Sequence, residues 1–361
     1  MFGLSGKAAV GLGIDIGSGS IRAVECAGKT SLTLSNYGEL GAAPVLKAMH
    51  DPAAAAGHED IEHDVAALVH QLLSAMRVKH RRAALALPAH TVRIAVLEFP
   101  AMHGRDLHDA VLYQAERLVT VPLSEVVLDW EVVEERPETE DRPPATLVLV
   151  AAVDRTVVDR YVRIAKYAGI GLLGLEAEPF SLVRVAGLQN DGPYAILDFG
   201  GLRSGLVFAH GKTVRASHEI EMTGSKLTTA LAHAMIVSED RAEALKMEHG
   251  LVPSGGVNLR MTLGPFIDGM VGEIRSRFAE HAQQTGGASV ERLYLSGSAA
   301  RLRGLVEYLG EQFGIPVEAL NAFGAFTIPP KLTGHIDEIA PAFSVASGLA
   351  LRHRHETHHH A

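Results

Sequence analysis

Cysteine is almost absent from the 361-residue chain, which contains only Cys26, so an intramolecular disulfide is excluded. Cys26 continues the alternating pattern of residues 21–26, which predicts a small buried side chain rather than a reactive thiol. No apolar run reaches the roughly 18 residues that span a bilayer, and neither end resembles a signal peptide. These absences favour a cytoplasmic globular protein without direct membrane insertion.

Positive charge is also scarce, because 33 Lys and Arg face 42 Asp and Glu and the formal net charge is −9. A nucleic-acid surface normally needs a clustered excess of Lys and Arg, so we expect no nucleic-acid partner. Several of the 19 histidines lie in the tail 351–361, which we interpret as a disordered His-rich end rather than a metal site.

One pattern is present twice: an apolar run that ends in Asp-x-Gly, at 13–19 around Asp15 and at 195–201 around Asp198. Glycines let backbone N–H groups approach phosphate oxygens, and a carboxylate can hold a hydrated metal ion. A single such loop is typical of an ordinary turn. Two copies indicate two similar domains that face each other around a nucleoside triphosphate.

Alternating hydrophobicity predicts a β-meander over 10–16, 21–26 and 31–40, with the first glycine loop as a hairpin turn. Rossmann and Walker folds place such a loop before a helix. In this chain β-branched residues follow the loop, so a helix is not expected there. A loop is expected over 47–60. The other expected helices of the first half are 61–76, 106–120 and 156–168, and its other strands are 83–87, 92–99, 125–134, 147–153 and 171–177. The second half repeats the meander over 194–199, 204–209 and 213–220, followed by helices over 225–234, 238–248, 263–283 and 302–313 and strands at 292–296 and 317.

These motifs resemble the actin-like ATPase superfamily, whose two similar domains clamp a nucleotide between paired hairpins. Residues 13–20 and 198–201 resemble its two phosphate motifs. Residues 175–182 and 340–350 are similar to its two interdomain connectors, and 295–302 to its adenosine motif. The resemblance implies an α/β protein with the two-domain actin-like, ribonuclease H-like fold.

Within that superfamily the chain resembles, over nearly its whole length, the PilM family of type IV pilus assembly proteins. Residues 107–117, 121–122 and 126–130 resemble the helix and strand of its inserted subdomain, which FtsA shares. The domains implied are subdomain 1A at 8–90 and 169–190, inserted subdomain 1C at 91–168, subdomain 2A at 191–224 and 290–350, and subdomain 2B at 225–289.

The resemblance also implies a site for ATP and Mg²⁺. The phosphate loops would donate backbone and hydroxyl hydrogens to phosphate oxygens from opposite sides, and Asp15 and Asp198 would hold Mg²⁺ mostly through water. The cofactor-binding residues expected are Asp15, Gly17, Ser18, Gly19, Ser20, Asp198, Gly200, Gly201, Gly297, Ser298 and Ala299.

Three positions leave the chemistry open. Glu178 is a candidate catalytic residue that positions the attacking water, or it simply ends a strand before Pro179. Arg203 contacts a phosphate or points to solvent. The adenosine loop reads Gly-Ser-Ala at 297–299 instead of the more frequent Gly-Gly-Gly. Nucleotide binding is therefore favoured over turnover, and the chain is expected to be at most a slow ATPase.

The function implied is a cytoplasmic adaptor, peripheral to the inner membrane through its protein partners. It would bind the N-terminal cytoplasmic peptide of PilN, an inner-membrane protein, and link it to the pilus motor ATPases and the platform protein. An extended peptide could dock on the inserted subdomain, where Val111 and Trp130 are candidate contacts, with a core role as the alternative for Trp130.

Two other functions remain open on the same fold. One is an FtsA-like filament-forming scaffold, although the polar residues after Arg352 offer no amphipathic membrane anchor. The other is a small-molecule kinase, for which the second half offers no clear base besides Asp198. The adaptor could also belong to a related competence or pseudopilus system.

Overall fold

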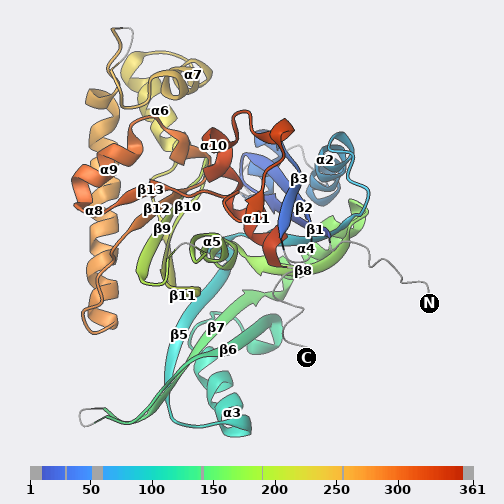
Figure 1. Cartoon of the computed structure of the whole chain (residues 1–361), viewed down its shortest axis with the longest axis vertical. Coiled ribbons are helices and arrows are strands. Elements are labelled where there is room, and N and C mark those ends of the chain that lie inside the picture. Colours follow the sequence, from blue (N-terminus) through green and yellow to red (C-terminus); the bar gives the residue numbers. More distant parts are fainter. Residues whose placement is uncertain are drawn as a thin grey trace.

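The computed structural model describes residues 10–28, 31–50, 60–139, 142–188, 190–253 and 256–352. Within these ranges the chain forms a six-stranded, a five-stranded and a three-stranded sheet. In Figure 1 the six-stranded sheet lies on the right, the five-stranded sheet on the left and the three-stranded sheet below them. The expected disordered tail lies, from residue 353 onward, outside the described residues.

The six-stranded sheet contains the predicted meander and has the order β14-β3-β2-β1-β4-β8. Its central strand β1 pairs antiparallel with β2 and parallel with β4. The strands are β1 (Val10–Ile16), β2 (Ser20–Ala27), β3 (Leu32–Gly41), β4 (Arg82–Leu87), β8 (Gly171–Ala177) and β14 (Phe326–Thr327). The helices of this half are α1 (Ala43–His50), α2 (Ile61–Ala75), α4 (Arg155–Tyr167) and α5 (Glu178–Ala186). The prediction of a loop from residue 47 was wrong at its start, because Leu46 and Met49 anchor α1 in the core.

The five-stranded sheet repeats this plan with the order β11-β10-β9-β12-β13. Its central strand β9 pairs antiparallel with β10 and parallel with β12, as β1 does with β2 and β4. The strands are β9 (Pro193–Phe199), β10 (Ser204–His210), β11 (Thr213–Ile220), β12 (Leu293–Ser296) and β13 (Val317–Ala319). The helices are α6 (Gly224–Met235), α7 (Glu239–His249), α8 (Arg260–Gln284) and α9 (Leu305–Phe313).

The three-stranded antiparallel sheet, order β5-β7-β6, forms a unit inserted between β4 and β8. It contains β5 (Val92–Pro100), β6 (Val126–Arg136) and β7 (Ala145–Asp154). Helix α3 (Gly104–Ala115) packs on this sheet through Leu107 and Val111, which meet Val148 and Val150 in a small separate core. We call residues 92–154 the inserted subdomain; it lies at the bottom of Figure 1.

After β13 the chain returns to the first half, where the sequence predicted that residues up to 350 stay with the second. Strand β14 pairs with β3, and α11 (Ser344–Leu351), which follows the short α10 (Ile336–Ile339), packs on β1. Helix α11 is buried along its whole length, between the apolar sheet face at β1 and helix α5. Leu351, the first residue of the expected tail, belongs to this helix.

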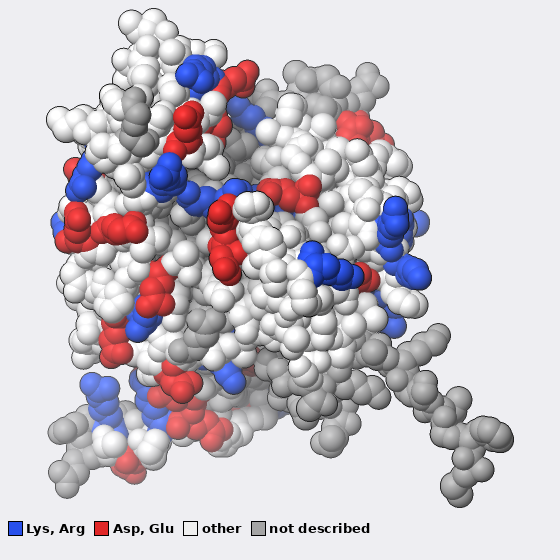
Figure 2. All heavy atoms as spheres, turned by 45° about the horizontal axis from the view of Figure 1, so that its top comes forward, with Lys and Arg blue, Asp and Glu red and all other residues white. Residues whose placement is uncertain are grey.

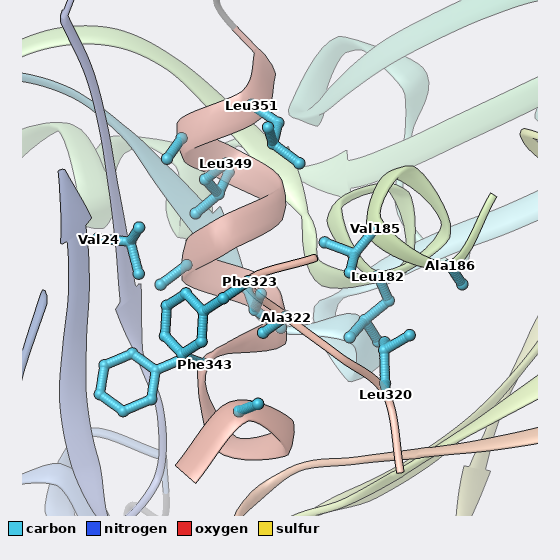
Figure 3. Close-up of a cluster of buried hydrophobic side chains, with 14 of the residues drawn as sticks. Val24, Leu182, Val185, Ala186, Leu320, Ala322, Phe323, Phe343, Leu349 and Leu351 are labelled. Carbon is cyan, nitrogen blue, oxygen red and sulfur yellow. The ribbon is translucent and has the colours of Figure 1, made fainter. Parts of the chain in front are cut away.

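The two halves share one hydrophobic core around α11. Phe343 and Leu349 from the C-terminal segment pack with Val24 of β2 and Leu182 of α5 (Figure 3). The same cluster includes Ile196 of β9. This shared core joins the sheet that contains β1 to the sheet that contains β9.

No helix of the described ranges is both long and apolar enough to cross a membrane. On the face seen in Figure 2, Lys and Arg side chains lie interspersed with Asp and Glu side chains.

Candidate functional site

A cavity of about 270 Å³ lies between the two halves, and both Asp-x-Gly loops line it. Its walls include all the predicted cofactor-binding residues except Ala299, together with Glu178. Ala299 packs instead against the core of the second half, where its Cβ lies close to Gly224. The structure therefore gathers residues from four separated segments, 15–20, 178, 198–201 and 297–298, around one space.

The first loop is a tight hairpin turn whose donors are partly used within the protein. The Gly17 N–H donates to the Ser20 carbonyl at 3.1 Å, and the Ser20 hydroxyl donates to Glu39 at 2.8 Å. The Ser18 hydroxyl oxygen accepts a bond from the Leu202 N–H at 3.3 Å, which joins the two loops directly. The donors predicted from the sequence at positions 17 and 20 are thus engaged in shaping the turn.

The second loop directs its carbonyl groups away from the cavity. The Gly200 and Gly201 carbonyls accept bonds from the N–H groups of Gly224 and Ser225, at 2.9 and 2.8 Å, where α6 begins. A Cβ on Gly200 would lie 2.3 Å from the Arg203 carbonyl oxygen, so only glycine fits this turn. Bound to α6 in this way, the loop has a fixed position.

The predicted adenosine loop also needs its glycine. Gly297 has φ +90°, and a Cβ there would lie 2.5 Å from the Phe199 carbonyl oxygen. Its N–H donates to the Pro341 carbonyl at 2.9 Å. The backbone of this loop therefore rests directly on the end of β9 and borders the cavity beside Asp198.

Three carboxyl groups meet at the cavity: the buried Asp15 and the half-buried Glu178 and Asp198. Burial raises the pKa of Asp15 to about 6, and the neighbouring Asp198 adds to this rise while Arg22 opposes it. Burial, followed by the charges of Asp15 and Asp198, raises the pKa of Glu178 well above its usual value. Burial also raises the pKa of Asp198. Three carboxylates here are too many to remain ionised without an added cation.

The carboxyl groups fit a hydrated divalent cation. The Asp15 Oδ1 atom is buried without a hydrogen-bond partner, so it remains available to a water of the ion's hydration shell. Among the described residues, no group of three or more His, Cys, Asp and Glu side chains is placed to hold a metal directly. Mg²⁺ keeps several of its waters, so this arrangement suits the predicted water-mediated binding.

Glu178 begins α5, and its Oε2 atom accepts a bond from the Ala89 N–H at 2.8 Å. Ala89 lies in the short 3₁₀ helix η2 (Ala89–Thr91) that connects β4 to β5. Glu178 is thus held by the first residues that lead into the inserted subdomain.

Arg22 is a cavity residue that the sequence analysis did not single out. It is buried in β2, and its guanidinium lies 2.7 Å from Glu39 and 3.8 Å from Asp15. A cation at this depth is positioned for phosphate oxygens as well as for Asp15. The sequence signal was a charged residue in an apolar strand directly after the glycine loop.

Arg203, whose role the sequence left open, also lines the cavity. Its guanidinium pairs with Glu219 of β11 at 2.8 Å, and 43% of the side chain is exposed. The structure therefore ties this residue to β11 at the edge of the cavity.

The two predicted partner contacts differ in exposure. Val111 is fully buried between α3 and the sheet and presents no surface to a partner. Its inward position follows from the helical period that also buries Leu107 and Ala115. Trp130 is half-buried against the same core, and its ring centroid lies 6.1 Å from that of His108.

Comparison with known proteins identifies relatives of this architecture. A family model described as type IV pilus assembly protein PilM matches residues 13–354. A search of curated protein sequences found no match.

Two solved structures are similar over most of the chain. The first is the PilM-PilN type IV pilus biogenesis complex, with a TM-score of 0.79 and 25% identity, covering 95% of this chain and 98% of that one. The second is the ethanolamine utilization protein EutJ from Carboxydothermus hydrogenoformans, with a TM-score of 0.54 and 16% identity, covering 95% of this chain and 89% of that one. Together with the repeated sheet plan, these similarities confirm the two-domain actin-like fold. Because the family model extends over nearly the whole sequence, the chain belongs to the PilM family of type IV pilus assembly proteins.

Proposed function

We propose that this protein is an ATP-binding adaptor of type IV pilus assembly that binds the N-terminal cytoplasmic peptide of a PilN-like inner-membrane protein. The observation that carries the proposal is the cavity between the halves, where paired glycine loops and three carboxyl groups converge. Similarity to a PilM-PilN complex over nearly the whole chain supports the choice of partner. The adaptor would work in the cytoplasm at the inner membrane, linking that partner to the pilus motor ATPases and the platform protein.

The chain's own residues divide the work of nucleotide binding. Arg22 and the Ser18 hydroxyl would donate to phosphate oxygens from the first half, and the backbone at Gly201 from the second. Asp15 and Asp198 would hold the waters of Mg²⁺, which supplies the positive charge that these carboxylates need. Gly297 and Ser298 would border the adenosine because the loop has no side chain at its tightest point.

Glu178 would determine whether the site also turns over nucleotide. Its carboxyl group lines the cavity, and its raised pKa favours the protonated form when no cation is present. A cation near Asp15 and Asp198 would lower that pKa, and the resulting carboxylate could then orient water. We expect slow turnover at most, and Glu178→Gln is expected to abolish it while nucleotide affinity changes less than about 3-fold. ATP hydrolysis measured beside equilibrium binding checks both.

The inserted subdomain is the proposed docking place for the partner peptide. Its edge strand β6 offers unpaired backbone groups, and Trp130 lies half-exposed on this strand. An extended peptide can add to such an edge while its apolar side chains contact the neighbouring surface.

Calorimetric titration tests the proposal. The protein is titrated with a synthetic peptide copying the N-terminal cytoplasmic segment of the PilN-like protein from the same organism, and separately with Mg²⁺-ATP. We expect micromolar binding of the peptide, and an affinity for Mg²⁺-ATP that falls at least about 50-fold in Asp198→Asn, because a cavity carboxylate is lost.

Asp191→Asn is the matched control, since it makes the same chemical change at an exposed position outside the cavity. Equal loss in both variants would contradict the assignment of Asp198. Nucleotide binding without peptide binding would contradict the adaptor function and favour a filament-forming scaffold, which light scattering with Mg²⁺-ATP would detect.

A further inference from the structure

The inserted subdomain touches the second half of the molecule, although it is inserted in the first. An Arg215 Nη2 atom of β11 lies 3.3 Å from Oε2 of Glu134 in β6. Arg215 is 20% exposed and Glu134 is 36% exposed, so the pair lies partly within the interface. Strands β11 and β5 also pack together, which places this strand of the subdomain against the second half.

Both partners of this ion pair lie at β-bulges. In β11, Phe208 faces Ala216 and Ala209 faces Val214, which leaves Arg215 as the extra residue of the bulge. In β6, Val132 faces Val148 and Glu134 faces Leu147, so Val133 is the extra residue. Two irregular strands thus meet at their bulges.

A bulge bends its strand and re-aims the neighbouring side chain. A regular β11 would pair residue 215 within its own hairpin, and a regular β6 would turn the side chain of residue 134 to the other face. The side chain of Glu134 would then point away from β11. The coincidence of two bulges at one ion pair indicates a contact built into both strands.

Further ion pairs lie on both sides of the Glu134–Arg215 contact. Glu134 also binds Arg136 at 2.8 Å, and Arg136 binds Glu98 of β5 at 3.0 Å, so the charges extend across the inserted subdomain. At the other end of β11, Glu219 holds Arg203 of the second phosphate loop. Strand β11 therefore extends from the cavity, which Glu219 lines, to the inserted subdomain, which Arg215 contacts. In Figure 1, β11 lies directly above β5.

We infer that the Glu134–Arg215 contact links occupancy of the cavity to partner binding on the inserted subdomain, a role that rests on the proposed function. A ligand that contacts both halves changes how closely they approach. Because β11 is tied to Glu134, that movement either breaks the contact or displaces the inserted subdomain. Each ligand then changes the affinity for the other by the same factor.

Hydrogen–deuterium exchange on the ligand-free protein tests the mechanical part without any ligand. We expect Arg215→Ala to increase exchange at least about 3-fold both in the second phosphate loop, 200–205, and in β5 at 94–98. A change confined to 213–217 and 132–136 would overturn the inference. Arg163→Ala is the matched control, because it removes an ion pair with Glu62 that lies wholly within the first half.

The binding part is tested by a double-mutant cycle. Peptide affinity is measured with and without Mg²⁺ and a non-hydrolysable ATP analogue in the parent, Glu134→Ala, Arg215→Ala and the double variant. In the parent, we expect the peptide affinities with and without the analogue to differ at least about 5-fold. In each single variant this difference should be below about 1.5-fold, and the double variant should show no additional effect. In Arg215→Ala, whose changed residue lies outside both the proposed docking strand and the cavity lining, the affinity for each ligand alone should change less than about 2-fold.

The outcomes separate this inference from the proposed function. A parent that binds both ligands with a ratio of one, or variants that keep the parent ratio, would overturn the link and leave the adaptor proposal intact. A parent that binds neither ligand would overturn the adaptor proposal, and the exchange measurement would then decide the mechanical contact alone.

Discussion

The two halves share one strand plan but treat their central strands differently. Strand β1 has glycine at the positions four and two residues before its aspartate, Gly11 and Gly13, where β9 has the buried Tyr194 and Ile196. Helix α11 packs so closely on β1 that a Cβ on Gly13 would lie 2.1 Å from the Ala346 carbonyl oxygen. The same strand order thus allows a helix to pack directly on the backbone of the central strand in one half, whereas the central strand of the other half carries large side chains.

The phosphate loops differ in a similar way. The first loop has charged groups beside its turn, because the buried Arg22 lies near the buried Asp15 and also binds the exposed Glu39. The second brings a fixed backbone, because its carbonyls bond to the start of α6. A cavity with a buried guanidinium in its first wall and backbone donors in its second has a defined orientation for a phosphate chain, which two identical loops would not provide.

The largest expected effect comes from giving β1 the side chains of β9. Gly13→Val would place two methyl groups against the backbone of Ala346 and Ala350, which cannot move without displacing α11. We expect a loss of more than about 4 kcal/mol in the free energy of unfolding, measured by urea denaturation. Gly310→Ala in α9 is the control, since nothing lies within 4 Å of its Cβ position and a gain of about 0.5 kcal/mol is expected. A small loss at Gly13 would show that α11 does not pack this closely.

The reverse change removes a side chain from β9. Ile196→Ala leaves a cavity in the core that the halves share, and we expect it to cost about 3 to 4 kcal/mol of unfolding free energy. Ile236→Ala is the same substitution at a position that is 93% exposed, where the change should stay within about 0.5 kcal/mol. Equal effects at the two sites would contradict the shared core.

Asp15, in the first wall of the cavity, should make the free energy of unfolding depend on pH. Its pKa is raised from 3.8 to about 6 in the folded protein, so ionising it costs stability as the pH rises through this range. Asp15→Asn should equal the parent below pH 4 and exceed it by on the order of 2 to 3 kcal/mol above pH 7, without nucleotide. Thermal unfolding between pH 4 and 8 measures this difference. The stability of Asp191→Asn should differ from that of the parent by a small amount that does not change with pH. If the difference for Asp15→Asn is also independent of pH, burial does not raise the pKa of Asp15.

The smallest effect concerns the bond between the loops. Ser18→Ala removes the acceptor for the Leu202 N–H, and we expect a loss of about 0.5 to 1 kcal/mol in unfolding free energy. Exchange at the Leu202 amide should increase, whereas the exposed substitution Ser124→Ala should leave it unchanged. Unchanged exchange in Ser18→Ala would mean that the loops are held together by their surroundings alone.

Local patterns were sufficient to predict much of this fold. The β-meander of each half, the hairpin loops and most cavity residues follow from alternation and from glycine beside aspartate, because strands and tight turns depend on neighbours in sequence. The resemblance of residues 107–130 to an inserted subdomain also held, although α3 ends at Ala115 rather than at residue 120.

Long-range contacts account for what the sequence did not predict. The pairing of β14 with β3 joins residues almost 300 positions apart, and the sequence of a two-residue strand does not predict which strand it pairs with. The bond from Ser20 to Glu39 and the position of Arg22 depend on the register of β2 with β3. The extra residues Val133 and Arg215 are defined only by the strands opposite them, so alternation alone could not locate them.

The return of α11 to β1 has a consequence for synthesis on the ribosome. Gly11 and Gly13 leave a stretch of β1 backbone without side chains, and residues 344–351 pack against it. At typical elongation rates that cover emerges between about 20 and 60 s after β1. During this interval the nascent chain exposes an apolar sheet face, the kind of surface that chaperones bind and that drives misassembly. Translation speed should therefore influence the yield of this protein more than that of one whose N-terminal sheet is completed by nearby residues.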